Sequence, residues 1–207
     1  NLVGTFRTAC HTIVAIDLMR TLDKQQMLSG YAEMLKHALL DSQQLLHDTL
    51  ALDLDQTDET QLAALIERNV DVKRRIVDAD PTEHDLRKIL NFGHTVGHAL
   101  ESISINTDPP MSHGHAVARG IVAELYISHA LLHLPREIVT HIHNIVNTTY
   151  GTYNCPCNHI DELIKLMHHD KKRTADDINF TLLSDIGQPH INCTAHPSLI
   201  EEALLYL

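Results

Sequence analysis

Apolar residues recur at intervals of three and four positions along most of the 207-residue chain, as they do on the buried face of an amphipathic helix. Residues 25–50 fit one or two packed helices, and residues 57–80 fit another with Thr57 or Asp58 as its N-cap. The same spacing predicts helices over residues 115–132, 137–150, 160–170 and 197–207. The pattern therefore predicts a mainly helical protein.

Two segments favour strands instead. Residues 12–16 form a short β-branched run, and residues 176–193 alternate as expected of a hairpin. We find no internal repeat, low-complexity tract or clean linker in the sequence. The predicted fold class is thus mainly α, a multi-helix domain with a few short β-strands.

A further helix is predicted to start at Asp80, which can accept a bond from a free backbone N–H. Pro81 follows at a position where its missing donor costs nothing, and Glu83 suits the positive end of the helix dipole. This helix should run to about Ile103. Residues 105–114, with two prolines and a glycine, then predict a loop of the kind that often carries function.

Composition excludes some functional classes. The formal net charge of -11 argues against a general nucleic-acid binder, although a local basic pocket could still hold a small anion. No run of about 18 apolar residues is present, so we expect no membrane span. The hydrophobic content of 43% is enough for a sizeable core, and we expect a cytoplasmic globular protein.

The cysteines do not suggest a disulfide scaffold, because four of them stand at uneven spacings. They are Cys10, Cys155, Cys157 and Cys193. We interpret them as reduced thiols. The sequence CPCNH at residues 155–159 could form a separate metal site, but its spacing is cramped and no fourth ligand is evident.

The stretch NFGHTVGHALES, residues 91–102, carries the first chemical signal. On a continuous helix, Asn91, His94 and His98 would lie within about 40° of Arg87 around the axis. A polar stripe on an otherwise apolar helix must face solvent or a wet cavity. Histidines four positions apart suit a metal or a proton shuttle, although a chain with 17 histidines can form such a pair by chance.

Gly93 and Gly97 favour the functional interpretation of this helix. Each costs up to about 1 kcal/mol in a helix interior relative to alanine. Such a cost is reasonable where a ligand or another helix must approach closely.

Two more segments supply donor groups. Glu33 and Lys36 stand three positions apart on one predicted helix face, either as a surface ion pair or as part of a site. His113 and His115 flank Gly114 at a predicted junction of loop and helix. One carboxylate and two imidazoles with open positions would make a catalytic divalent-metal site, closest to the zinc type.

Several cations remain, and solvated charge is the usual explanation for any one of them. They are Lys73, Arg87, Lys171 and Lys172. Gathered around a metal, they would bind a substrate that carries carboxylate and phosphate groups.

Taken in order, these motifs resemble a known family. The segments GYAEMLKHALL, LNFGHTVGHALES, HGHAVARGI and DKK, with the spacing from Lys73 to Arg87, closely resemble 3-dehydroquinate synthase of the shikimate pathway. The resemblance implies that residues 1–207 are the C-terminal helical metal- and substrate-binding domain. Residues 1–20 would be a connecting strand segment from an N-terminal NAD-binding domain outside this chain.

The resemblance also implies roles for single residues. Glu33, His94 and His113 match the family's three ligands for Zn²⁺ or Co²⁺. The matched substrate contacts are Asn1, Lys36, Lys73, Arg87, Asn91, His98 and Lys171. Of these, the residues with catalytic roles would be His98, Lys36 and Arg87.

The implied substrate is a small phosphorylated sugar acid, 3-deoxy-D-arabino-heptulosonate 7-phosphate. The family converts it into 3-dehydroquinate and phosphate, with NAD bound mainly by the N-terminal domain. The resemblance suggests a homodimer, and we expect neither a nucleic-acid nor a membrane partner.

Three positions depart from the family's pattern. Ala38 and Asp85 each replace a usual glycine, and His115 stands where many relatives have glutamate. Asp85 beside Arg87 could weaken anion binding.

Three alternative functions stay open: another sugar-phosphate cyclase, a metal-dependent polyol dehydrogenase, and an inactive metal-binding helical fragment. Glu33 with the GHTVGH spacing favours a cyclase over a dehydrogenase.

Overall fold

The computed structural model describes residues 10–56, 58–105, 107, 109–169 and 178–207. Asn1, Thr57, Lys171 and Lys172 lie outside these ranges, so the structure does not test the roles predicted for them.

Eight α-helices and one β-hairpin make up most of the described residues, which confirms the predicted fold class. The helices are α1 (Lys24–Asp41), α2 (Gln43–Leu50), α3 (Glu59–Ala79), α4 (His94–Ser104), α5 (His113–Leu132), α6 (Arg136–Tyr150), α7 (Ile160–His169) and α8 (Pro197–Leu205). The strands are β1 (Asn179–Asp185) and β2 (Gln188–Thr194). Three short 3-10 helices are η1 (Ile16–Thr21), η2 (Leu86–Asn91) and η3 (Cys157–His159). No helix of the described residues is long and apolar enough to cross a membrane.

The helix boundaries follow local side chains. The Asp23 carboxylate accepts a bond from the Gln26 amide at the start of α1, and Asp58 caps α3 as predicted. Ser42 divides residues 25–50 into α1 and α2, because its hydroxyl accepts from the Leu45 amide.

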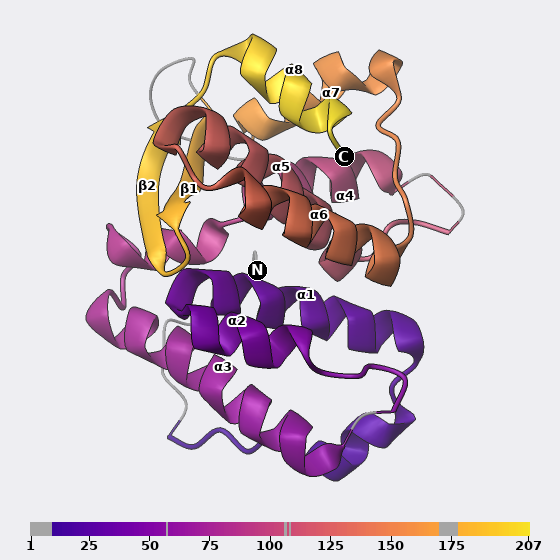
Figure 1. Ribbon diagram of the computed structural model, residues 1–207, viewed down its shortest axis with the longest axis vertical. Helices are drawn as coiled ribbons and strands as arrows, with labels where there is room; N and C mark the ends of the chain where they lie inside the picture. The colour runs from indigo at the N-terminus through magenta and orange to yellow at the C-terminus, as the bar shows by residue number, and fades with distance from the viewer. Residues whose placement is uncertain (1–9, 57, 106, 108, 170–177) are drawn as a thin grey trace.

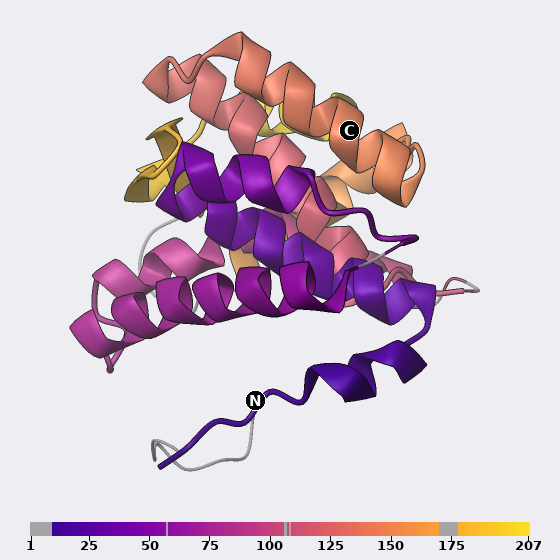
Figure 2. The ribbon, with the colours of Figure 1, turned by 60° about the horizontal axis from the view of Figure 1, so that its bottom comes forward.

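Helix α5 forms the centre of the molecule. It is buried on nearly all sides and contacts α1, α4, α6, α8 and β1. Figure 1 shows α1, α2 and α3 together in its lower part, with the other helices and the hairpin above them. Figure 2 shows that η1 and the segment before it lie to one side of the helix bundle.

The predicted strand at residues 12–16 is wrong. Residues 11–15 have no regular structure, Ile16 begins η1, and Ile13 is 90% exposed. A β-branched run needs a pairing partner to become a strand, and β1 and β2 pair with each other in an antiparallel hairpin. That hairpin confirms the second strand prediction.

The predicted continuous helix from Asp80 to Ile103 is also wrong. Pro81 disfavours helical geometry at Asp80, which instead ends α3. The Asp80 carboxylate accepts bonds from the amides of three later residues, namely His84, Asp85 and Arg87. These bonds, that of Arg87 first, lower the pKa of Asp80 to about 2. The chain then forms η2, breaks again at Gly93 with a φ of +77°, and only afterwards enters α4.

Close helix approaches explain the glycines of this region. A Cβ atom at Gly120 of α5 would lie 1.9 Å from the Gly93 carbonyl oxygen and 2.7 Å from the Gly97 amide nitrogen. A Cβ atom at Gly114 would lie 2.2 Å from the Ser29 Cα atom of α1. A Cβ atom at Gly93 would lie 2.6 Å from Cγ1 of Ile121, and one at Gly97 would lie 3.1 Å from Cα of Val117, so both glycines admit the neighbouring helix α5. The contacts bring α1, α4 and α5 together.

Candidate metal centre

Glu33, His94 and His113 meet where α1, α4 and α5 adjoin. Atom Nε2 of His94 lies 3.5 Å from Oε1 of Glu33, and Nε2 of His113 lies 3.6 Å from the same oxygen. One donor atom from each residue lies within 4.8 Å of the others. Among the described residues these three form the one group of this kind, and the sequence CPCNH at 155–159 does not form another.

Both imidazoles present the same ring nitrogen to Glu33. Nδ1 of His94 is 3.1 Å from the Phe92 carbonyl oxygen, which can only accept a hydrogen bond. Nδ1 of His113 is 3.0 Å from Oε2 of Glu101, which as a carboxylate also only accepts. Each Nδ1 therefore donates, and each Nε2 is left to face the carboxylate of Glu33.

The two oxygens of Glu33 have different surroundings. Oε2 accepts a hydrogen bond of 2.7 Å from Nζ of Lys36, and Lys36 is only 3% exposed. Oε1 is buried and has no hydrogen-bond partner. It faces Nε2 of His94, so two acceptors oppose each other across 3.5 Å. Ligands at about 2.1 Å from a tetrahedral zinc ion lie about 3.4 Å apart, so the spacing and donor set fit a divalent cation.

The protonation states agree with this fit. Burial, with help from the charge of Lys36, lowers the pKa of His94 to about 4, which makes this ring neutral near pH 7. Burial alone would raise the pKa of Glu33, but contact with His113 and the charge of Lys36 outweigh it and lower that pKa. Contact with Glu33 raises the pKa of His113 to about 9, against a smaller opposing effect of burial. The carboxylate is therefore ionised and His94 is neutral before any cation arrives, while His113 would release its Nε2 proton when a cation binds.

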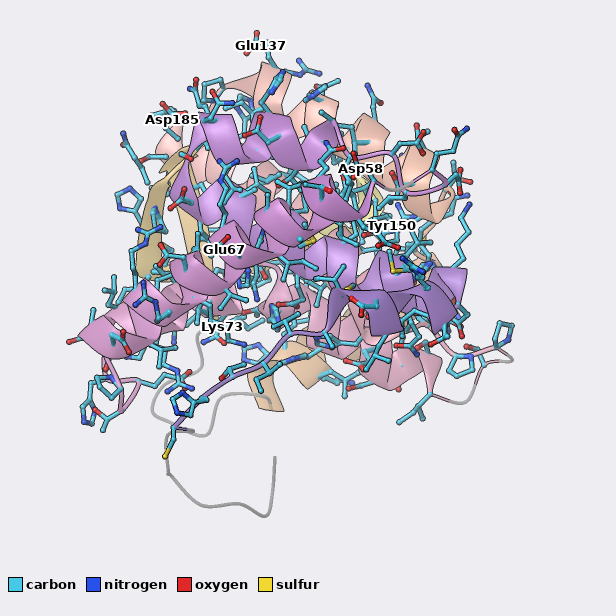
Figure 3. The ribbon with its side chains drawn as sticks, turned by 90° about the horizontal axis from the view of Figure 1, so that it is seen from below. Asp58, Glu67, Lys73, Glu137, Tyr150 and Asp185 are labelled. Carbon is cyan, nitrogen blue, oxygen red and sulfur yellow. The ribbon has the colours of Figure 1, made fainter. Side chains whose placement is uncertain are left out.

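Lys36 and Lys73 lie on the α1–α3 side of this centre. Burial lowers the pKa of Lys36, while Glu33 opposes the shift and Lys73 adds to it. Lys73 is exposed on α3, as Figure 3 shows, and with Glu33 it lines a mainly apolar cavity of about 230 Å³. The structure thus places both lysines near the carboxylate.

Arg87 and Asn91 lie on η2 instead of on a helix shared with the histidines. Arg87 and Asn91 therefore do not share one helix face with His94 and His98, contrary to the prediction from the sequence. The Arg87 guanidinium donates to the Pro81 carbonyl oxygen at 3.0 Å and lies 3.9 Å from the Glu83 carboxylate. It is held by its own loop in this structure.

His98 lies beside the three proposed ligands. Its ring centroid is 5.2 Å from that of His94 and 6.0 Å from that of His113. His98 follows His94 by one helix turn, as the sequence predicted for these two residues.

The structure places the three residues that depart from the family's pattern. His115 occupies the third position of α5, and its Nδ1 lies 2.7 Å from the hydroxyl of Ser112, the residue before the helix. Ala38 is fully buried in the core. The Arg87 side chain meets Glu83 and not Asp85, whose backbone amide is bound by Asp80.

Sequence reasoning missed two carboxylates near this centre. Glu101 contacts His113, and it could have been found because positions 94, 98 and 101 share one face of α4. Glu124 of α5 is fully buried and accepts from the amides of Gly93 and Val96 at 2.7 and 3.4 Å, which fixes the start of α4. No sequence signal joins residues so far apart in the chain.

Comparisons with known proteins agree on one family. The sequence model of the 3-dehydroquinate synthase C-terminal family matches residues 30–173. The 3-dehydroquinate synthase of Parabacteroides distasonis is 43% identical over 204 residues, which cover 99% of this chain and 58% of that protein. The protein of the same name from Listeria monocytogenes is 33% identical over 193 residues, covering 92% and 52% respectively.

Solved structures show the same fold at lower identity. A 2-deoxy-scyllo-inosose synthase complexed with carbaglucose-6-phosphate, NAD⁺ and Co²⁺ matches with a TM-score of 0.74 at 20% identity, over 92% of this chain and 55% of that one. A 2-epi-5-epi-valiolone synthase from Streptomyces hygroscopicus with NAD⁺ and Zn²⁺ bound matches with a TM-score of 0.72, also at 20% identity, over 92% and 53%. The chain spans between 52% and 58% of the two curated relatives described above. On the match of its family model, the chain belongs to the 3-dehydroquinate synthase C-terminal family.

Proposed function

We propose that Glu33, His94 and His113 hold a divalent cation, Zn²⁺ or Co²⁺. The observation that carries this proposal is the buried Oε1 atom of Glu33, which has no hydrogen-bond partner and lies 3.5 and 3.6 Å from the Nε2 atoms of His94 and His113. Such a cation supplies Lewis-acid chemistry, polarising a bound hydroxyl or carbonyl oxygen.

The residues around these ligands would bind an anionic substrate. Lys73 and Arg87 would contact its carboxylate and phosphate groups, and Asn91 would hydrogen bond to a hydroxyl group. Lys36 and His98 would move protons, since a buried ammonium with a lowered pKa releases its Nζ proton more readily. We extend the proposal to Asn1 and Lys171, which lie outside the described residues.

The reaction proposed for the longer protein is that of 3-dehydroquinate synthase. This phosphate-eliminating lyase converts 3-deoxy-D-arabino-heptulosonate 7-phosphate into 3-dehydroquinate and phosphate, in the biosynthesis of aromatic amino acids. Support comes from the 43% identity to a relative of that name. The NAD would be held mainly outside this chain, and the working form would be a cytoplasmic homodimer.

A chimera tests the reaction. This chain would replace the 58% of the Parabacteroides distasonis protein that it matches, and the chimera would be assayed with NAD, Zn²⁺ and the heptulosonate phosphate. We expect release of phosphate and formation of 3-dehydroquinate, with both abolished by a chelator. The matched His94→Gln chimera should lose at least about 100-fold in rate, because even outer-shell changes cost about 10- to 100-fold.

Other outcomes would replace the proposal. Phosphate release from a different sugar phosphate alone would indicate another cyclase, and polyol oxidation without phosphate release would indicate a dehydrogenase. A folded, metal-loaded chimera that catalyses neither reaction would contradict an enzymatic role for this chain.

A further inference from the structure

Glu101 links the two histidine-bearing helices. It lies seven positions after His94 on α4, and its Oε2 atom accepts from Nδ1 of His113 at the start of α5, at 3.0 Å. The carboxylate thus reaches from the helix of one imidazole to the ring of the other. Its contact falls on the nitrogen opposite to the one that faces Glu33.

The two imidazoles are fixed by different kinds of acceptor. Nδ1 of His94 is bound by the Phe92 carbonyl oxygen, which belongs to the main chain just before α4. His113 stands at the first position of its helix and uses a charged side chain from another element. A carboxylate acceptor makes the opposite ring nitrogen a stronger electron donor than a neutral acceptor does.

Stability alone does not account for this contact. The side chains of His113 and Glu101 are 41% and 38% exposed, and ion pairs at such positions contribute only about 0–1 kcal/mol to folding. Glu101 therefore contributes at most about 1 kcal/mol to the fold, while its contact keeps a proton on Nδ1 of His113.

We propose that Glu101 is a positioning residue for the metal centre, which orients His113 and keeps its Nε2 lone pair directed at the cation. This inference rests on the proposed metal site formed by Glu33, His94 and His113. It predicts that Glu101 sets metal affinity without touching the metal or the substrate.

The experiment compares three forms of the full chain: wild type, Glu101→Ala and Glu101→Gln. Zn²⁺ affinity is measured by competition with a chelator, and the absorption spectrum is recorded with Co²⁺. We expect Glu101→Ala to weaken Zn²⁺ binding about 10- to 100-fold and to alter the Co²⁺ bands. Glu101→Gln keeps a neutral acceptor and should lose less.

Two controls separate positioning from folding. Glu67→Ala removes an exposed carboxylate from α3 (Figure 3) and should leave Zn²⁺ affinity unchanged. The thermal midpoint of the metal-free protein should be the same for all four forms. ¹⁵N NMR of the zinc-loaded protein should show the Nδ1–H of His113 hydrogen bonded in the wild type, and its chemical shift should change when Glu101→Ala removes the acceptor.

The Zn²⁺ affinities distinguish failure of the role of Glu101 from failure of the proposed metal site. Equal Zn²⁺ affinity of the wild type and Glu101→Ala would overturn the role of Glu101 and leave the metal centre standing. A wild-type chain that binds no Zn²⁺ would overturn both.

Discussion

Glu33, His94 and His113 come from three helices that pack against one another, whereas Lys73 and Arg87 have exposed or half-exposed side chains. The helices approach so closely that two of their contact positions have no room for a Cβ atom. Arg87 by contrast bonds to its own loop. The difference teaches that folding itself sets the geometry of the proposed ligands, while the proposed anion contacts depend on side chains that can still move.

The largest effect is expected from a substitution that forces α4 and α5 apart, because their close packing sets the positions of the proposed ligands. Gly120→Ala would drive a methyl group into the Gly93 carbonyl oxygen, and overpacking of this kind costs roughly 3 kcal/mol or more. Both the urea midpoint and Zn²⁺ binding should fall sharply. Gly30→Ala is the matched control, because nothing lies within 4 Å of its Cβ position and alanine favours the helix by up to about 1 kcal/mol. Equal stability of the two variants would contradict the close approach.

A second change separates metal binding from stability. Glu33→Gln should weaken Zn²⁺ binding at least about 100-fold and destabilise the metal-free fold by roughly 1–3 kcal/mol, because buried Lys36 loses its ionic partner. The double variant Glu33→Gln with Lys36→Met should recover stability but not Zn²⁺ binding, as shown by denaturation and calorimetry. Recovery of both would show that Glu33 is not a ligand.

The stability of the fold should depend on pH through Asp80, whose carboxylate holds the loop that carries Arg87. Its folded-state pKa lies near 2, below the ordinary 3.8, so the ionised carboxylate stabilises the fold above about pH 4 and this contribution is lost as pH falls towards 2. Urea denaturation should find wild type more stable than Asp80→Asn at about pH 5.5, and this difference should narrow to less than half near pH 2.5. A gap independent of pH would exclude this role for Asp80.

The smallest expected effect concerns the Arg87 side chain. Glu83→Gln removes the carboxylate 3.9 Å from the guanidinium, and exposed pairs contribute at most about 1 kcal/mol. Phosphate binding, followed by NMR titration, should therefore tighten by no more than about fivefold. Arg87→Lys is the control for the role of Arg87 in phosphate binding, because lysine keeps the positive charge but lacks the planar guanidinium group. Tightening far above fivefold would show that the loop blocks Arg87 more strongly than the structure indicates.

Local periodicity predicted most helices because each of them buries one apolar face. It failed at residues 80–103, where the apolar spacing continues through η2 and α4 although Gly93 breaks the backbone between them. It failed at residues 12–16 because strand formation depends on a pairing partner that local sequence cannot reveal.

The site shows the same limit. The residue types of Glu33, His94 and His113 were sufficient to nominate a metal site, since carboxylates and imidazoles are metal ligands wherever they converge. Their convergence depends on glycines such as Gly114 and Gly120, whose role appears only when two helices are placed side by side. Spacing along one helix does not predict such contacts.

The central claim is tested most directly by anomalous X-ray scattering at the zinc absorption edge, from crystals of the chain grown with Zn²⁺. The account predicts one peak about 2.0–2.2 Å from Oε1 of Glu33 and from Nε2 of both His94 and His113. A peak bound to other residues, or none at these three, would contradict it.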